Sequence, residues 1–202
     1  MTLWGKVMKK AAVVSAKGGV GKTTIALHLM ILACLAGTRA AIYDADDGES
    51  SLEWGRTRER SFGSLSPIYA HPVDDVDLLI VDTPPNSYTE LPRLLSGSDL
   101  VLIPTRPGGL DLKLTRRTID MVRQLGLPMA VVLSLPAPRM PEIEEASKWL
   151  KAEGVPIAGL IHHRVDIGRA GLQGMALHEL DSTSKGCEEF VRVYEYMCNI
   201  IK

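Results

Sequence analysis

The chain has 202 residues, of which 46% are hydrophobic and 23% are charged, and its formal net charge at pH 7 is -1. A chain of this length can bury a full hydrophobic core without disulfides or metals, and the balanced charge excludes a protein whose whole surface is cationic. Cys34, Cys187 and Cys198 are too few and too scattered for a disulfide framework or a zinc site, which favours a reducing compartment.

The apolar segments are too short to cross a membrane. The longest, residues 25–37, contains His28 and falls short of the roughly 20 apolar residues that a spanning helix needs. The apolar run 11–16 is shorter than the roughly 7–15 residues of a secretory signal, and a glycine-rich motif follows it at once. The sequence therefore predicts a cytoplasmic protein.

Segments typical of strands alternate with segments typical of helices along the chain. The predicted strands are short apolar runs at residues 11–16, 39–43, 78–81, 100–103, 129–133 and 156–161, with a minor strand at 67–70. The predicted helices cover residues 23–36, 50–60, 110–125, 141–152 and 187–201. Continuous apolar strands that alternate with helices predict an α/β fold, with one domain over residues 1–202 and a mainly parallel, twisted sheet covered by helices on both faces.

Residues able to do chemistry follow the predicted strands. They occupy residues 17–24, 44–48, 82–85 and 104–111. Parallel sheets bind ligands at the carboxyl ends of their strands. The four segments therefore predict one shared site.

The strongest motif is a phosphate-binding loop at residues 17–24, Lys-Gly-Gly-Val-Gly-Lys-Thr-Thr, between a predicted strand and a predicted helix. Glycines let backbone N–H groups converge on one anion, and the helix that follows adds the positive end of its dipole. Lys22 is predicted to neutralise the β- and γ-phosphates, and the Thr23 hydroxyl is predicted to bind Mg²⁺. The predicted nucleotide-binding residues of the loop are Gly18, Gly19, Val20, Gly21, Lys22, Thr23 and Thr24.

The loop departs from the plain pattern GxxxxGK[ST], because Ala16 stands in place of the first glycine and Lys17 follows it. This form, KGGxGKTT, resembles the deviant Walker A box of the ParA/MinD family of dimerising P-loop ATPases. The chain is most similar to the small ParA-type partition proteins that lack an N-terminal helix-turn-helix domain. The resemblance implies ATP and Mg²⁺ as ligands and an ATP-dependent homodimer. In that dimer Lys17 would act catalytically by reaching the partner's nucleotide and offsetting charge that builds up during phosphoryl transfer.

An acidic segment at residues 44–48 looks like the first switch of this family, D-x-D-P-Q, and Trp54 follows it as a tryptophan does in the family. The match implies that Asp46 orients or activates the attacking water and that Asp44 supports the metal site. Carboxylates two residues apart on an extended segment share one side, so both could face the phosphates. The usual Pro-Gln is Asp47-Gly48 in this chain.

The strand at residues 78–81 ends at Asp82 and resembles a Walker B strand. Asp82 is predicted to hold Mg²⁺, directly or through water. The next segment, Thr83-Pro84-Pro85, is similar to the second switch of the family. Asp111, after the following strand and loop, is expected near the nucleotide and the dimer interface.

The region 164–174 is similar in position to the segment of the family that lies near the base and faces DNA, and Arg164 and Arg169 are the predicted DNA contacts. Sequence-independent DNA binding needs clustered cations and is salt-sensitive. A MinD-like protein would carry a basic amphipathic membrane helix at its C-terminus. The tail here is not basic, so we expect no membrane partner.

Together these features predict an ATPase that converts ATP to ADP and phosphate and works as a switch for plasmid or chromosome partition or for cargo positioning. The ATP-bound dimer would bind nonspecific double-stranded DNA and associate with the nucleoid. A ParB-like or ribbon-helix-helix centromere-binding adaptor would stimulate hydrolysis. Two alternatives stay open, namely a P-loop metabolic ligase of the same fold, such as a dethiobiotin synthetase-like enzyme, and a MinD-like membrane-cycling positioning ATPase.

Overall fold

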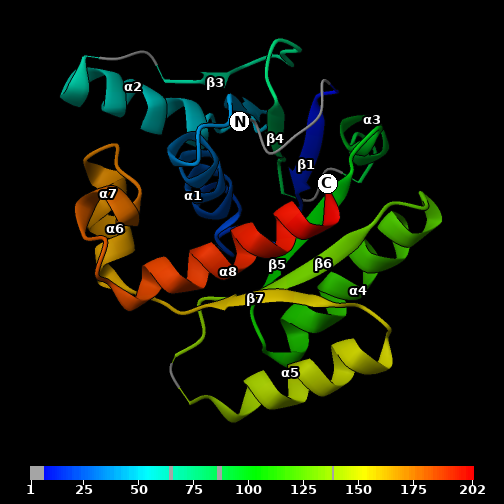
Figure 1. Cartoon of the computed structure of the whole chain (residues 1–202). Helices are drawn as coiled ribbons and strands as arrows, with labels where there is room; N and C mark the ends of the chain where they lie inside the picture. The colour runs from blue at the N-terminus through cyan, green and yellow to red at the C-terminus, as the bar shows by residue number, and fades with distance from the viewer. Residues whose placement is uncertain (1–6, 64–65, 86–87, 138) are drawn as a thin grey trace.

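A computed structural model describes residues 7–63, 66–85, 88–137 and 139–202. Its centre is one seven-stranded sheet in the order β3-β2-β4-β1-β5-β6-β7, and neighbouring strands pair in parallel (Figure 1). The strands are Lys9–Val13 (β1), Ala40–Asp44 (β2), Ile68–Tyr69 (β3), Leu78–Asp82 (β4), Leu100–Thr105 (β5), Met129–Ser134 (β6) and Ile157–Ile161 (β7). The predicted α/β class with a parallel sheet is confirmed.

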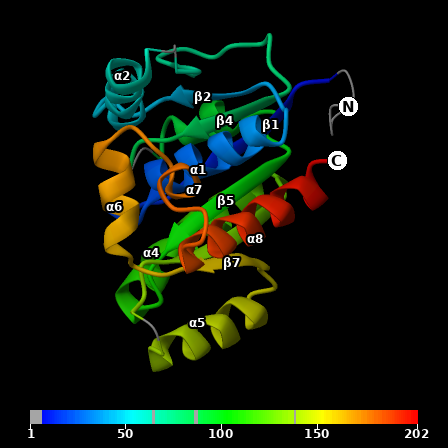
Figure 2. The same ribbon diagram turned by 60° about the vertical axis from the view of Figure 1, so that its left-hand side comes forward.

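Helices cover both faces of this sheet. They are Lys22–Leu35 (α1), Ser50–Phe62 (α2), Leu91–Leu95 (α3), Gly109–Gln124 (α4), Pro141–Ala152 (α5), Val165–Leu172 (α6), Leu177–Leu180 (α7) and Lys185–Ile200 (α8). Helices α1 and α8 pack on one face, and α3, α4 and α5 pack on the other (Figures 1 and 2). The sequence did not predict α3, α6 or α7, because each is short and α6 contains Gly168 and Gly171.

The apolar strands are continuous because both of their faces are buried. Ala11 and Val13 pack with residues of α1 and α8, whereas Ala12 and Val14 pack with residues of α3, α4 and α5. The apolar run 25–37 forms most of α1, which is buried almost all round and therefore shows no clear polar face. Among the described residues, no helix is both long enough and apolar enough to span a bilayer.

The strand register places the predicted functional segments at one edge of the sheet. Val13 pairs with Asp82, and Asp82 pairs in turn with Asp44. The carboxyl ends of β1, β4 and β2 therefore lie side by side. The sheet order also changes direction around β1, and ligands of open parallel sheets bind at such a point.

Helix α2 is joined to the α6–α7 segment by Arg58. Its guanidinium donates to the Gly174 carbonyl at 2.9 Å and forms a bidentate pair with the Glu179 carboxylate at 2.7 and 2.9 Å. The contact needs a glycine at position 174, because the φ angle there is +69° and a Cβ would lie 2.5 Å from the Arg58 backbone. The close approach of α2 to α6 thus depends on Gly174.

His28 joins α1 to α7 and α8 inside the core. Its Nε2 accepts the Leu177 N–H at 3.1 Å, so Nδ1 carries the proton and donates to the Thr24 carbonyl at 2.7 Å. The ring stacks on Phe190 with centroids 3.8 Å apart. Burial lowers the pKa of His28 from 6.5 to about 4, so the folded protein keeps this side chain neutral near pH 7.

We predict that Gly174→Ala lowers the free energy of unfolding by about 2–4 kcal/mol. The left-handed backbone costs a non-glycine residue roughly 1–2 kcal/mol, and the added methyl group is overpacked against Arg58. Denaturant unfolding of the two proteins measures the difference. Gly171→Ala in α6 is the matched control, since open space surrounds its Cβ, and it should change stability by less than about 1 kcal/mol. Equal effects of the two substitutions would contradict the assigned close contact.

His28 also predicts a pH dependence of stability. Between pH 6.5 and about 4, His28 is protonated in the unfolded chain but not in the folded chain. The free energy of unfolding therefore decreases by up to about 3 kcal/mol as the pH is lowered through this range. His28→Gln removes this titration. The stability advantage of the wild type over His28→Gln should therefore shrink from pH 7 to pH 4 in parallel denaturant titrations. A constant difference across this range would show that His28 does not titrate as inferred.

Candidate functional site

The loop between β1 and α1 has the backbone of an anion-binding loop. Gly19 and Gly21 have φ angles of +68° and +88°, which only glycine adopts readily. Gly21 is the N-cap of α1, and it has no side chain that could accept hydrogen bonds from the first N–H groups of the helix. Because those N–H groups have no partner within an α-helix, they are available to an anion.

Contacts from two other elements hold the loop in place. The Ser134 hydroxyl at the end of β6 donates to the Val20 carbonyl at 2.7 Å. The Arg106 guanidinium after β5 donates to the Gly19 carbonyl at 2.9 Å. Both contacts fix peptide groups of the loop from outside, so the loop is preformed. The sequence predicted that the segment 104–111 belongs to the shared site but did not single out Arg106, and it did not predict Ser134, which belongs to no linear motif.

Lys22 lies at the start of α1 and is only 7% exposed. Burial lowers the pKa of its ammonium group, and the charges of Asp82 and Asp46 oppose that shift. An anion bound in the loop would favour the charged ammonium further. Lys22 is therefore a buried ammonium group at the wall of the cavity, and its contact with the phosphates stays a prediction.

The Asp82 carboxylate lies directly behind the loop. Its Oδ2 accepts hydrogen bonds from the Thr23 hydroxyl at 2.7 Å and from the Ser51 hydroxyl at 2.8 Å. Its Oδ1 is buried and has no hydrogen-bond partner within the described ranges. Burial raises the pKa of Asp82 to about 6, and the two hydroxyl donors oppose this rise.

This arrangement fits Mg²⁺. The ion is usually bound through one or two carboxylates, with phosphate oxygens and water completing its ligands. An unpartnered carboxylate oxygen beside the Thr23 hydroxyl supplies the protein's share. The described part of the chain contains no cluster of three or more His, Cys, Asp or Glu side chains that could hold a metal alone. The residues present therefore fit a magnesium ion that is shared with a nucleotide.

The two carboxylates of the first switch segment take different positions. Asp46 lines the cavity in front of the loop, and its Oδ1 accepts the Gly48 N–H at 3.0 Å. Asp44 is buried, and the described residues that line the cavity do not include it. Its two oxygens accept the backbone N–H groups of Asp46 and Leu52 at 3.2 and 3.0 Å. The structure thus brings Asp46 to the loop and uses Asp44 to hold the segment that carries Asp46.

Lys17 and Asp111 form an ion pair beside the loop, with 2.7 Å between Nζ and Oδ1. Asp111 lies in the first turn of α4, and Lys17 is 39% exposed. Neither residue is among the described residues that line the cavity. Asp111 therefore lies beside the loop and contacts Lys17, and its place near the nucleotide and the dimer interface stays a prediction.

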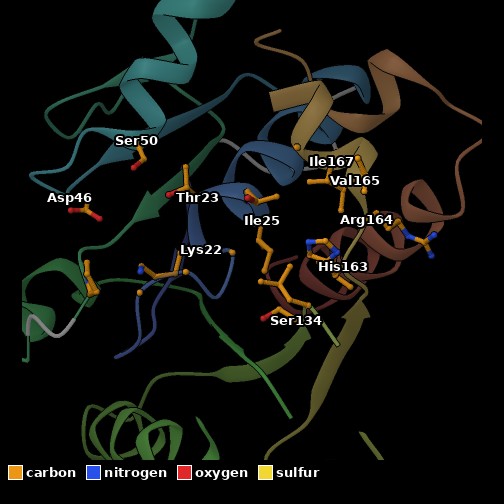
Figure 3. Close-up of a pocket in the computed structure, with 18 residues that line it drawn as sticks. Lys22, Thr23, Ile25, Asp46, Ser50, Ser134, His163, Arg164, Val165 and Ile167 are labelled. Carbon is orange, nitrogen blue, oxygen red and sulfur yellow. The ribbon is translucent and has the colours of Figure 1, made fainter. Parts of the chain in front are cut away.

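The cavity has a volume of 690 Å³, within the usual range for small-molecule sites. One end is formed by the loop and Asp46, and the other by residues that follow β6 and β7 (Figure 3). Leu135 after β6 and His163 after β7 belong to this second wall. Nothing in the sequence indicated their role, because they adjoin the loop only through the parallel sheet.

The predicted DNA contacts lie in different surroundings. Arg164 lines the cavity, and its Nη2 is 2.6 Å from Oε1 of Glu189 in α8. Glu189 also accepts the His162 ring nitrogen and backbone N–H. Arg169 is 68% exposed on α6 and pairs with Asp166 at 3.2 Å. The structure therefore does not bring the two arginines together as one surface of unpaired cations.

Comparisons with known proteins agree with this geometry. Residues 11–177 match the family model described as the CobQ/CobB/MinD/ParA nucleotide binding domain. The "Maintenance of carboxysome distribution protein A" of Gloeobacter kilaueensis is 31% identical over 178 residues, which cover 82% of each chain.

Solved structures agree in fold at lower identity. A plasmid partition protein of Borrelia burgdorferi bound to AMPPNP superposes with a TM-score of 0.76 at 18% identity, covering 95% of this chain and 99% of that one. The septum site-determining protein MinD of Pyrococcus horikoshii with Mg-ADP has a TM-score of 0.74 at 17% identity, covering 94% and 96%. This chain belongs to the CobQ/CobB/MinD/ParA family of nucleotide-binding domains, within which the ParA and MinD proteins are ATPases that use ATP and Mg²⁺.

Proposed function

We propose that the protein is an ATP-driven switch that positions a cargo on DNA. In the ATP state it would dimerise and bind nonspecific double-stranded DNA, which would place it on the nucleoid in the cytoplasm. An adaptor on the cargo, of the ParB-like or ribbon-helix-helix kind, would stimulate hydrolysis and release the dimer. The cargo would be a plasmid, a chromosome region or a protein assembly. The relatives named for carboxysome distribution and for plasmid partition support this class of function.

The position of Lys17 is the observation that carries the proposal. Lys22 is buried against the cavity, whereas Lys17 lies at the rim, partly exposed and paired with Asp111. Lys17 is not among the described residues that line the cavity, and its exposed side chain can meet a second subunit that approaches the same face. The geometry therefore supports a site that is completed by dimerisation.

Each residue of the cavity would then have a defined task. ATP with Mg²⁺, when bound, supplies the γ-phosphoryl group and the charge of the metal. Lys22 would hold the phosphates, and Thr23 and Asp82 would hold the ion. Asp46 would orient the attacking water, since its carboxylate faces the cavity and is fixed by the Gly48 N–H. Lys17 of the partner would offset the charge of the transferring group.

DNA binding by α6 is the further part of the proposal. Arg169 is the better placed of the two predicted arginines, because it is exposed and its pair with Asp166 is a surface contact of small strength. Arg164 would instead act indirectly, by holding the turn between β7 and α6 against Glu189. The roles of Arg164 and Arg169 can both be tested by substituting each arginine and measuring DNA binding.

We predict that the protein binds random-sequence duplex DNA with ATP but not with ADP or without nucleotide. Phosphate contacts should make this affinity fall by at least about tenfold between roughly 50 and 200 mM salt. Fluorescence anisotropy of a labelled duplex measures it, with Lys22→Ala as the control that removes nucleotide dependence and Arg169→Ala as the surface variant.

Other outcomes would separate the competing functions. If the protein binds ATP but does not bind DNA with ATP, with ADP or without nucleotide, the proposed DNA-positioning function is wrong. Binding to anionic vesicles only with ATP would indicate a membrane-cycling positioner. ATP consumption that requires a small carboxylate or amine substrate would indicate a ligase.

We also predict that Lys17→Ala retains nucleotide binding near the wild-type affinity but lowers ATP turnover by about 100-fold or more, as expected for the loss of one charge-stabilising group. It should also abolish the ATP-dependent dimer in analytical ultracentrifugation. Lys22→Ala is the contrast, because it should lose nucleotide binding itself. Normal turnover by Lys17→Ala would exclude a role for this lysine across a dimer.

A further inference from the structure

Ser51 contacts the carboxylate of the predicted magnesium site from a helix outside the phosphate loop. It is the second residue of α2 and is fully buried. Its hydroxyl donates to Oδ2 of Asp82 at 2.8 Å. Its neighbour Ser50 is exposed and lines the cavity, so the two serines at the start of α2 lie in different surroundings.

The two oxygens of Asp82 are treated differently. Oδ2 receives two hydroxyl donors, Thr23 from α1 and Ser51 from α2, at 2.7 and 2.8 Å. Oδ1 receives none from the described residues although it is buried. A buried charged oxygen without a partner is costly, and such groups in native proteins usually await a ligand, an ion or a water. The pair of donors therefore fixes one oxygen and leaves the other for a ligand.

The backbone around Ser51 is itself fixed. The next residue, Leu52, donates its N–H to Oδ2 of Asp44 at 3.0 Å. Asp44 ends β2 and pairs with Asp82 in the neighbouring strand. Ser51 thus lies between two strand-terminal carboxylates, one holding its helix and the other accepting its hydroxyl.

We propose that Ser51 is a positioning residue for Mg²⁺. It holds Oδ2 of Asp82 together with Thr23, so that Oδ1 is presented to the hydrated ion. Groups that orient metal-binding side chains in this way change metal affinity when they are removed. The inference rests on the proposed role of Asp82 in holding Mg²⁺, and it does not depend on the cargo, on DNA or on the partner.

The test compares the wild type with Ser51→Ala, a substitution that removes one oxygen and adds no bulk. A fluorescent ADP analogue is titrated into the full chain, first in EDTA and then at increasing MgCl₂ concentrations. The expected result is a midpoint about tenfold higher in Mg²⁺ for Ser51→Ala, with unchanged affinity in EDTA. Ser98→Ala is the matched control, since Ser98 is also buried, makes no side-chain hydrogen bond with the described residues and precedes β5 at the opposite edge of the sheet.

Four results would overturn the proposal. An unchanged midpoint would show that Thr23 alone orients Asp82. A lower midpoint would show that Ser51 competes with the ion for the carboxylate. An equal loss of affinity in EDTA and in Mg²⁺ would show that the hydroxyl only supports the fold of α2. If the wild type itself shows no Mg²⁺ dependence, the assignment of Asp82 fails and the role of Ser51 fails with it.

Discussion

The buried carboxylate of Asp82 is the constraint on which the site depends. Burying a carboxylate is costly unless donors or cations compensate, and here two hydroxyls donate to it while Lys22 lies within electrostatic range. These groups come from two places along the chain, since Lys22 and Thr23 begin α1 and Ser51 lies at the start of α2. They meet because β4 lies next to β1 and β2 in parallel register. A shift of one residue in that register would turn the Asp82 side chain to the other face of the sheet and separate the site.

Hydrogen bonds also connect the segment 44–48, which resembles the first switch, to the strand ends beside Asp82. Its sequence lacks the usual Pro-Gln, yet the segment is held by bonds from its own carboxylates to backbone N–H groups of Asp46, Gly48 and Leu52. These bonds attach the start of α2 to the strand ends. Farther along α2, Arg58 attaches the same helix to Gly174 and Glu179. A movement of the switch segment would therefore reach α6 and α7 through one rigid helix.

How much of the structure the sequence could predict depends on how far apart along the chain the interacting residues lie. The strands were predictable because both of their faces are buried, which leaves unbroken apolar runs, and the phosphate loop was predictable because its residues are contiguous. Ser51 and Ser134 could not be found, and Arg106 was not singled out within the predicted segment 104–111, because their contacts exist only after strands distant in sequence become neighbours. Arg164 illustrates the converse, since an arginine that suggested a DNA contact is bound to Glu189 by the packing of α8.

The two lysines of the loop, Lys17 and Lys22, differ in how far their side chains are exposed to solvent. Lys22 is buried at the wall of the cavity, so its charge acts in a medium of lower dielectric constant than water. Lys17 is 39% exposed, and its ion-pair partner Asp111 is 13% exposed. In the proposed dimer, a multiply charged phosphate presented by a second subunit would compete with this single carboxylate for the lysine. The proposed function requires a cation that is held beside the loop and is accessible to a second subunit, and the partly exposed Lys17 meets this condition.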